Sequence, residues 1–278
     1  MKGFSIAGGS VPGTDHIKPG QPVWVNNHDA FTWRTGKDFM VAVVCDGCGS
    51  GEHSEVGAKI GAEFVAKRIA ARFGPEMMWF YESSVPSLLS QTQEGLIKLI
   101  SEIARGMGSE EDLERIVENY FLFTIVGVLV SPDWTVTFSM GDGVLALNGD
   151  VHVIPPFPGN APPYIGNYAR ARDPGRPLAN FVRHQVIPTA DVQSILIGSD
   201  GVGDLIEAEA MPLPGKIDLV GPLAQFWTDD KFIQNPDMIR RRLAVVNREW
   251  VDGRHIRKGL LRDDTTLVVI RRHIQMEE

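Results

Sequence analysis

Residues 41–51 read VAVVCDGCGSG, an apolar run that ends in Asp46 and is followed by glycines at alternate positions. A strand that stops at a carboxylate holds it firmly, and glycines beside it let a ligand approach the backbone closely. A second run of the same kind, ILIGSDGVGD at residues 195–204, places Asp200 at a strand end. Two such corners in one chain predict a site for a hard metal ion with oxygen ligands.

The composition is that of an ordinary globular protein. Of the 278 residues, 43% are hydrophobic and 22% are charged. The chain shows no repeat and no clear linker, which favours a single domain over residues 1–278. The formal net charge of -8 argues against nucleic acid as a partner. No stretch is long and apolar enough to span a membrane, and the start lacks a secretory pattern, so we expect a cytoplasmic protein that binds no membrane.

The only cysteines, Cys45 and Cys48, form a lone C-x-x-C pair. Such a pair can be a redox centre or half of a zinc site. No second cysteine pair exists to complete a zinc site, and Cys45 falls inside the apolar strand. We therefore expect two reduced thiols that flank Asp46.

Hydrophobic periodicity divides the chain into helical and strand segments. It predicts helices over residues 54–73, 87–105, 109–118, 206–209 and 236–250. It predicts strands over residues 22–31, 39–45, 120–130, 134–140, 144–147, 151–154, 181–187, 194–197 and 265–271. Strands joined by hairpins, with helices grouped between them, favour an α+β sandwich over a doubly wound parallel sheet.

The segment over residues 155–177 is rich in Pro, Gly and Arg, and we interpret the region around residues 155–180 as a surface loop or flap. Longer loops are often functional. We expect Arg170, Arg172 and Arg176 to help attract phosphorylated or acidic partners, and a plain solvated loop is the alternative.

A set of aspartates falls at strand ends or in tight turns: Asp29, Asp46, Asp142, Asp200, Asp204, Asp263 and Asp264. Carboxylates that converge raise one another's pKa and require a cation. All-oxygen ligands favour Mg²⁺ or Mn²⁺ over zinc. A pair of such ions can activate a shared water and clamp a phosphoryl group, which predicts a two-metal phosphoester hydrolase. The alternative is that each aspartate only caps a turn or a helix.

Several separate segments match the sequence motifs of one protein family, and they occur in the same order as in that family. They are NHDA at residues 27–30, VVCDG at 43–47, MGDG at 140–143, IGSDGVGD at 197–204 and RDDTTLVV at 262–269. Together with GTDH at residues 13–16, they resemble the bacterial-type branch of the metal-dependent Ser/Thr protein phosphatases, the PPM or type-2C family. The resemblance implies a four-layer α-β-β-α sandwich, with two central antiparallel sheets flanked by helices. It also implies hydrolysis of phosphoserine and phosphothreonine in a phosphorylated protein substrate by a metal-bridging hydroxide.

The resemblance also assigns roles to residues. Asp46 would bridge two Mn²⁺ or Mg²⁺ ions, with the Gly47 carbonyl on one of them, and Asp200 and Asp263 would complete the other. Asp29 would hold metal-bound water or bind directly. Asp142 and Asp204, together with Asp200, match positions that bind a third, weaker ion in some members. Catalysis would therefore rest on Asp46, Asp200 and Asp263.

The sequence departs from the family pattern at positions where other members bind the substrate phosphate and donate a proton. Residues 23–25 read VWV, where several members carry an arginine, which leaves His16, Arg34 or metal-bound waters as candidates for holding phosphate. Cys48 stands where some members have a histidine proposed as general acid, so a metal-bound water or His53 is the candidate proton donor. These departures keep two alternatives open: a catalytically weak or inactive binding or regulatory module of the same fold, and a small-molecule phosphoester hydrolase.

Overall fold

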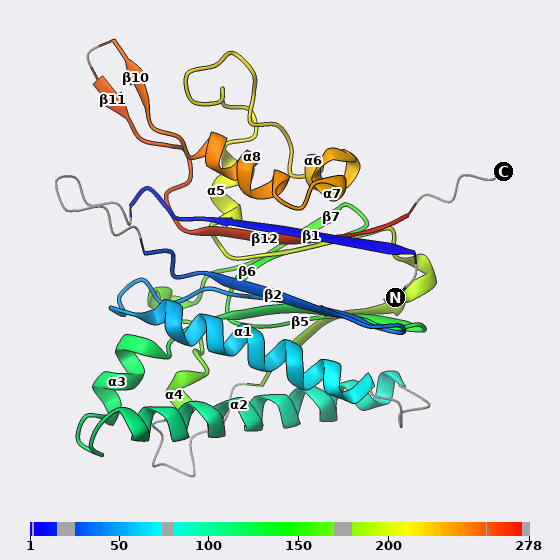
Figure 1. Ribbon diagram of the computed structural model, residues 1–278, viewed down its shortest axis with the longest axis vertical. Helices are drawn as coiled ribbons and strands as arrows, with labels where there is room; N and C mark the ends of the chain where they lie inside the picture. The colour runs from blue at the N-terminus through cyan, green and yellow to red at the C-terminus, as the bar shows by residue number, and fades with distance from the viewer. Residues whose placement is uncertain (2, 16–25, 74–80, 170–179, 254, 274–278) are drawn as a thin grey trace.

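Two five-stranded antiparallel sheets lie face to face, and helices cover the outer face of each (Figure 1). The computed structural model describes residues 1, 3–15, 26–73, 81–169, 180–253 and 255–273. The helix-sheet-sheet-helix order confirms the α+β sandwich expected from the sequence, including its four layers.

The first sheet has the strand order β1-β12-β9-β6-β7, and the second has the order β2-β3-β4-β5-β8. The strands of the first sheet are β1 (Phe4–Val11), β6 (Gly143–Leu147), β7 (Asp150–Ile154), β9 (Ser194–Gly198) and β12 (Thr265–Arg272). Those of the second are β2 (Ala30–Thr35), β3 (Met40–Cys45), β4 (Ile125–Val130), β5 (Trp134–Met140) and β8 (Val182–Pro188). A separate two-stranded ribbon consists of β10 (Trp250–Asp252) and β11 (His255–Arg257).

The helices form two outer layers. The second sheet is covered by α1 (Ser54–Ala70), α2 (Val85–Met107), α3 (Leu113–Tyr120) and α4 (Gly166–Ala169). The first sheet is covered by α5 (Val202–Glu207), α6 (Gln225–Thr228), α7 (Lys231–Gln234) and α8 (Met238–Val246). Short 3₁₀ turns are η1 (Ala71–Phe73), η2 (Glu82–Ser84), η3 (Pro158–Asn160) and η4 (Thr189–Asp191).

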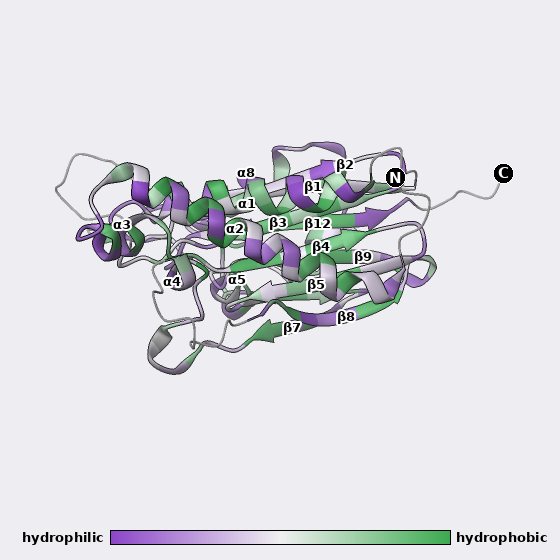
Figure 2. Ribbon diagram, turned by 90° about the horizontal axis from the view of Figure 1, so that it is seen from below, coloured by the Kyte–Doolittle hydropathy of each residue, from purple (hydrophilic) through white to green (hydrophobic). Residues whose placement is uncertain are grey.

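Strand β3 shows why the decisive stretch is apolar at every position. Val41 and Val43 pack against the helix layer, whereas Ala42 and Val44 pack between the two sheets. A strand buried on both faces has no polar side, so its sequence loses the usual alternation. The hydropathy colouring shows the same contrast between apolar inner strands and two-sided helices (Figure 2).

Helix α1 lies close to the segment that follows α3, because small residues face it. A Cβ atom at Gly57 would lie 2.2 Å from the Tyr120 carbonyl oxygen, and one at Gly61 would lie 2.3 Å from the Phe123 ring. These contacts hold the first half of α1, and with it the preceding glycine loop, against residues 120–123. Those residues lie beside the carboxylate cluster described below.

Strand β1 is missing from the sequence prediction. Of the strand predicted over residues 22–31, residues 22–25 lie outside the described residues, and in the described part a strand, β2, begins only at Ala30. The glycine pair Gly8-Gly9 hides β1, because glycine is depleted in strands. The structure gives both glycines a packing role. A Cβ atom at Gly9 would lie 2.4 Å from the Arg240 backbone nitrogen of α8, and one at Gly8 would lie 3.0 Å from the Phe31 ring.

Two other predicted boundaries are wrong. The strand predicted over residues 120–130 begins only at Ile125, since α3 continues to Tyr120 with Leu113, Ile116 and Val117 buried at helical spacing. The helix predicted over residues 236–250 ends at Val246, and the chain turns into the β10–β11 ribbon. Gly253 makes that ribbon turn with a φ of +63°, a conformation that favours glycine.

The predicted flap is only partly a surface loop. Ile165 is completely buried, and Gly166 and Ala169 are buried with it in the core beneath α2. Residues 170–179, which carry Arg170, Arg172 and Arg176, lie outside the described residues. The expectation that these arginines attract acidic partners therefore stays a prediction.

Candidate metal centre

Asp29 and Asp46 lie next to each other because of the strands that they flank. Asp29 directly precedes β2, Asp46 directly follows β3, and these strands pair antiparallel with Ala30 opposite Cys45. The two carboxyl groups are close enough to share a hydrogen bond. The end of the second sheet thus presents a pair of adjacent carboxyl groups.

The first sheet brings further carboxylates to the same place. Asp200 follows β9, Asp263 precedes β12 by two residues, and Asp142 lies in the turn between β5 and β6. Asp46, Asp142, Asp200 and Asp263 line one cleft of about 420 Å³. Corners that are more than 200 residues apart in sequence therefore meet in space.

The cleft combines carboxylates with small neutral groups. Its lining consists of Asp46, Gly47, Cys48, Gly49, Ser50, Thr124, Asp142, Gly159, Pro162, Tyr164, Asp200 and Asp263. No Lys, Arg or His side chain belongs to this lining within the part of the chain that the structure describes. The described lining of the cleft is therefore negatively charged, and none of its side chains carries a compensating positive charge.

The concentration of negative charge shifts the titration of these groups. Burial, followed by the neighbouring Asp29 and Asp200 carboxylates, raises the pKa of Asp46 well above its ordinary value. Burial and the Asp263 carboxylate raise the pKa of Asp200 to about 7. Burial and the Asp264 carboxylate likewise raise the pKa of Asp29. In each case burial is the largest cause of the raised pKa, and the neighbouring carboxylates add to it.

Two oxygen atoms of this cluster have no hydrogen-bond donor. Oδ1 of Asp29 and Oδ1 of Asp200 are buried without a partner. A buried acceptor without a donor is costly, and a divalent cation would satisfy it. All-carboxylate donors fit Mg²⁺ or Mn²⁺ and do not fit zinc, which prefers His and Cys. Among the described residues, no three His, Cys, Asp or Glu side chains are grouped so that they could hold one ion as they stand.

Asp264 belongs to the set of aspartates identified in the sequence, and its side chain connects three segments of the chain that carry family motifs. Its Oδ1 accepts a hydrogen bond of 2.7 Å from the Gly13 backbone N–H, and its Oδ2 accepts one of 2.6 Å from the His28 backbone N–H. The side chain is almost completely buried. It ties the N-terminal segment and the chain before β2 to the start of β12, and so positions Asp29 and Asp263.

Asp204 does not line the cleft and instead holds the corner on which Asp263 sits. Its carboxylate accepts hydrogen bonds from the Arg262 backbone N–H at 2.6 Å, from Arg262 Nε at 2.8 Å and from the Asp263 backbone N–H at 3.2 Å. Arg262 also pairs with Glu207 at 3.0 Å. Asp204 therefore lies beside Asp200 and Asp263, and it connects α5 to the residues just before β12.

Two of the three candidates for phosphate or proton roles, Arg34 and His53, are not in the described cleft lining. Arg34 lies near the far end of β2 and pairs with Glu63 of α1. His53 precedes α1, where its ring packs 5.1 Å from the Tyr120 ring and its Nδ1 lies 3.9 Å from Glu55 Oε1. His16 lies outside the described residues.

Tyr164 and Thr124 line the cleft although the sequence analysis singled out neither. Tyr164 comes from the predicted flap and Thr124 from the short link between α3 and β4. Neither belongs to a strand-aspartate corner or to a family motif, so no sequence signal marked them. The nearest clue was the position of Tyr164 in the segment interpreted as a surface loop or flap.

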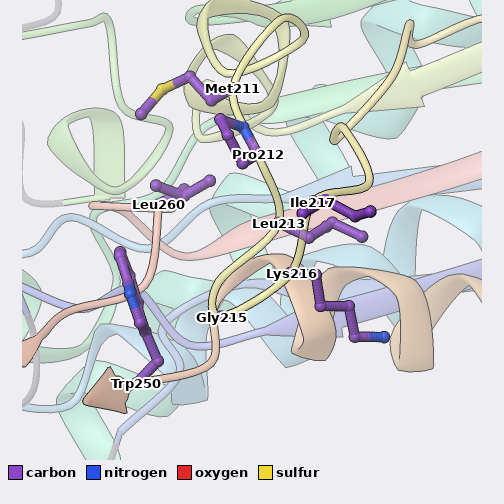
Figure 3. Close-up of a pocket in the computed structure, with 8 residues that line it drawn as sticks. All are labelled: Met211, Pro212, Leu213, Gly215, Lys216, Ile217, Trp250 and Leu260. Carbon is purple, nitrogen blue, oxygen red and sulfur yellow. The ribbon is translucent and has the colours of Figure 1, made fainter. Parts of the chain in front are cut away.

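A larger cavity of about 510 Å³ lies apart from the carboxylates (Figure 3). Its walls are mostly apolar: Met211, Pro212, Leu213, Gly215, Lys216, Ile217, Trp250 and Leu260. It contains no carboxylate and no metal-ligating side chain, so it does not compete with the acidic cleft as a hydrolytic centre.

No helix in the described parts of the chain is long and apolar enough to cross a membrane.

Comparison with known proteins agrees with this geometry. The family model of protein phosphatase 2C matches residues 12–233. The chain therefore belongs to the protein phosphatase 2C family, as the sequence resemblance implied.

Solved structures share the fold at low identity. A bacterial serine phosphatase is 13% identical with a TM-score of 0.56, covering 98% of this chain and 99% of that one. The serine/threonine phosphatase Stp1 from Staphylococcus aureus is 14% identical with a TM-score of 0.51, over 97% and 95%. The serine/threonine phosphatase of S. agalactiae is 15% identical with a TM-score of 0.54, over 97% and 100%. No curated protein sequence matches the chain.

Proposed function

We propose that this protein is a divalent-metal-dependent phosphatase that removes phosphate from Ser and Thr side chains of a phosphorylated protein. The observation that carries the proposal is the meeting of Asp46, Asp142, Asp200 and Asp263 in one cleft of a protein phosphatase 2C fold. The solved phosphatases of the same fold support the substrate class.

The residues divide into those that would hold ions and those that keep them in place. Asp46, the Gly47 carbonyl, Asp200 and Asp263 would hold two Mn²⁺ or Mg²⁺ ions, with Asp29 beside them and Asp142 available for a third. When bound, such ions supply Lewis acidity and lower the pKa of a coordinated water.

Asp29 is itself fixed by a neighbour. The Ser199 hydroxyl donates to Asp29 Oδ2 at 2.7 Å, which leaves Oδ1 as the free acceptor of that carboxyl group. The Ser199 hydrogen bond therefore fixes the orientation of Oδ1, which is buried and does not belong to the described cleft lining. Burial and the nearby Asp29 carboxylate raise the pKa of Asp46, which favours retention of a proton by this pair while no ion is bound.

Hydrolysis of small phosphoesters, or a binding role without fast chemistry, remains the alternative. The absence of Lys, Arg and His from the described cleft lining favours it, because none of the described lining residues offers a cationic side chain to a phosphate dianion. Assays with phosphopeptides, nucleotides and sugar phosphates side by side distinguish a protein substrate from a small one.

The test combines metal binding with turnover. Wild-type protein should hydrolyse a phosphothreonine peptide with Mn²⁺ and lose this activity in EDTA. Asp46→Asn and Asp200→Asn should each lower kcat/KM by more than about 100-fold, because changing even a residue that only supports a metal ligand typically costs about 10–100-fold.

Asp133→Asn is the matched control, since Asp133 lies in the turn between β4 and β5, at the ends of those strands away from the cleft. Turnover that persists in EDTA contradicts the proposal. Mn²⁺ binding measured by calorimetry without turnover on any phosphopeptide favours the binding role.

A further inference from the structure

Tyr164 is the only aromatic side chain in the described lining of the acidic cleft. It comes from the segment between β7 and α4, whereas the glycine loop at residues 47–51 supplies Gly47, Cys48, Gly49 and Ser50 to the same lining. Its phenol lies near the thiol of Cys48, which belongs to that loop and whose Sγ lies 3.1 Å from Ser50 Oγ. Tyr164 thus lies at the cleft that Asp46 and Asp142 also line.

The position of Tyr164 is fixed by the core beneath it. The next residue, Ile165, is completely buried, and a Cβ atom at Gly166 would lie 2.1 Å from the Phe121 carbonyl oxygen. The Tyr164 carbonyl accepts a hydrogen bond of 3.1 Å from the Asn167 N–H. The phenol is therefore presented by a packed turn.

The Cys48 side of the contact is anchored to the same segment. The Cys48 backbone N–H donates a hydrogen bond of 2.9 Å to the Leu122 carbonyl. Residues 121 and 122 therefore contact both segments: Phe121 packs against Gly166, and Leu122 accepts the hydrogen bond from Cys48. Both segments that line the cleft here are therefore packed against the same two residues.

A phenol with the ordinary pKa of about 10 is protonated at neutral pH, so Tyr164 is a neutral hydrogen-bond donor. Burial, the contact with Cys48 and the nearby Asp46 carboxylate raise the pKa of Tyr164 far above its usual value. The group therefore keeps its proton at any physiological pH. The other described side-chain donors of the lining are the small hydroxyls of Ser50 and Thr124 and the weakly donating thiol of Cys48.

We propose that the Tyr164 hydroxyl donates a hydrogen bond to a phosphoryl oxygen of the substrate, as a neutral substitute for a phosphate-gripping cation. On binding, the phenol exchanges its Cys48 contact for the phosphate oxygen, and no proton is transferred. This inference rests on the proposed function, since it concerns substrate in the same cleft. A neutral donor also avoids placing a cation beside the carboxylates that would hold the metal ions.

Tyr164→Phe tests this role because it removes one oxygen atom and keeps the ring. A hydrogen bond to a charged group typically contributes enough that we expect kcat/KM to fall by about 10–100-fold. The loss should be equal for p-nitrophenyl phosphate and phenyl phosphate, whose leaving groups differ in basicity. The affinity for inorganic phosphate, measured by calorimetry with Mn²⁺ present, should fall by about tenfold or more. Mn²⁺ binding itself should be unchanged.

Tyr168→Phe is the matched control, because Tyr168 lies on α4 just beyond Tyr164 and outside the cleft lining. Unchanged kcat/KM and phosphate affinity in Tyr164→Phe overturn the inference and leave the proposed function standing. A loss confined to phenyl phosphate, with phosphate affinity intact, also overturns it, since the phenol then serves the leaving oxygen. If wild type has no turnover but Tyr164→Phe weakens phosphate binding, the proposed function fails and the inference holds.

Discussion

The Ser199 hydroxyl donates a hydrogen bond of 2.7 Å to Oδ2 of Asp29, which lies 170 residues earlier in the chain. Ser199 directly follows β9 of the first sheet, and Asp29 directly precedes β2 of the second. The bond therefore closes the two sheets onto each other at the end where the carboxylates gather. Ser199 Oγ also accepts from the Thr266 backbone N–H at 3.0 Å, so the hydroxyl connects three strands.

Ser199→Ala should lower the free energy of unfolding by about 1–3 kcal/mol, because it removes a buried donor and leaves Asp29 Oδ2 and the Thr266 N–H without this partner. Urea unfolding in EDTA measures the effect. Ser90→Ala, on the exposed face of α2, is the control and should change stability little. Equal stability of the two variants would show that the Ser199 bond contributes nothing.

Gly201→Ala should disrupt the Asp200 corner. The added Cβ atom would lie 2.1 Å from the Asp264 carbonyl oxygen, which belongs to the backbone and cannot move aside cheaply. Overpacking of this kind costs about 1–3 kcal/mol of stability, and we also expect weaker Mn²⁺ binding.

Gly203→Ala, two residues further on, provides the control for Gly201→Ala. Nothing lies within 4 Å of the added Cβ atom, and the residue is helical, so stability should rise by about 0.5–1 kcal/mol. Similar destabilisation of both variants by thermal unfolding would contradict the packing argument.

Stability without metal should fall as pH rises. The folded pKa of Asp200 is raised to about 7, whereas an unfolded aspartate titrates near 4. Between these values the folded state binds a proton that the unfolded state has lost, so each pH step upward favours unfolding. The stabilising effect of protonation is complete below about pH 4 and is lost by about pH 7.

Thermal unfolding in EDTA at pH 5 and pH 8 checks this sign, and Asp200→Asn should reduce the difference. Mn²⁺ should oppose the trend, because its binding releases protons and its apparent affinity increases over the same pH range. Higher stability at pH 8 than at pH 5 in EDTA would be the wrong sign.

The two cysteines should react differently with a thiol reagent. Cys45 is completely buried, and burial raises the pKa of its thiol well above the ordinary value, whereas Cys48 is half-exposed at the cleft. Only the thiolate reacts. We expect one thiol to be labelled in the folded protein and both in urea, with Cys48→Ser abolishing the folded-state labelling. Labelling of Cys45 in the folded Cys48→Ser variant would contradict the packing around β3.

Asp204→Asn distinguishes a connecting role from a ligand role. The carboxylate accepts hydrogen bonds from Arg262 and from the Asp263 backbone, so its loss should lower the melting temperature in EDTA. Arg262→Ala should do the same, since it removes the other partner. If Asp204 is instead a ligand of a third ion, the variant should bind fewer Mn²⁺ ions in calorimetry and melt normally in EDTA.

Much of the fold was accessible from the sequence because the signals are local. An apolar run followed by Asp46 and glycine identifies a buried strand and its end, and Val56 and Ile60 at helical spacing indicate α1. Strand β1 and the β10–β11 ribbon escaped prediction for different reasons. The glycine pair of β1 is required by α8, a distant partner, and the ribbon is too short to show alternation.

The sequence by itself determined the chemistry available, namely a set of aspartates at strand ends whose oxygens suit hard cations. Only the tertiary structure decided how that set divides. It placed Asp46, Asp142, Asp200 and Asp263 in one cleft, and added Tyr164 from a different segment to the lining of that cleft. Asp264 and Asp204 instead accept hydrogen bonds from backbone N–H groups. The reason is physical: a strand end fixes where a side chain starts, but its neighbours are set by the packing of the two sheets, and that packing depends on contacts between residues far apart in the chain.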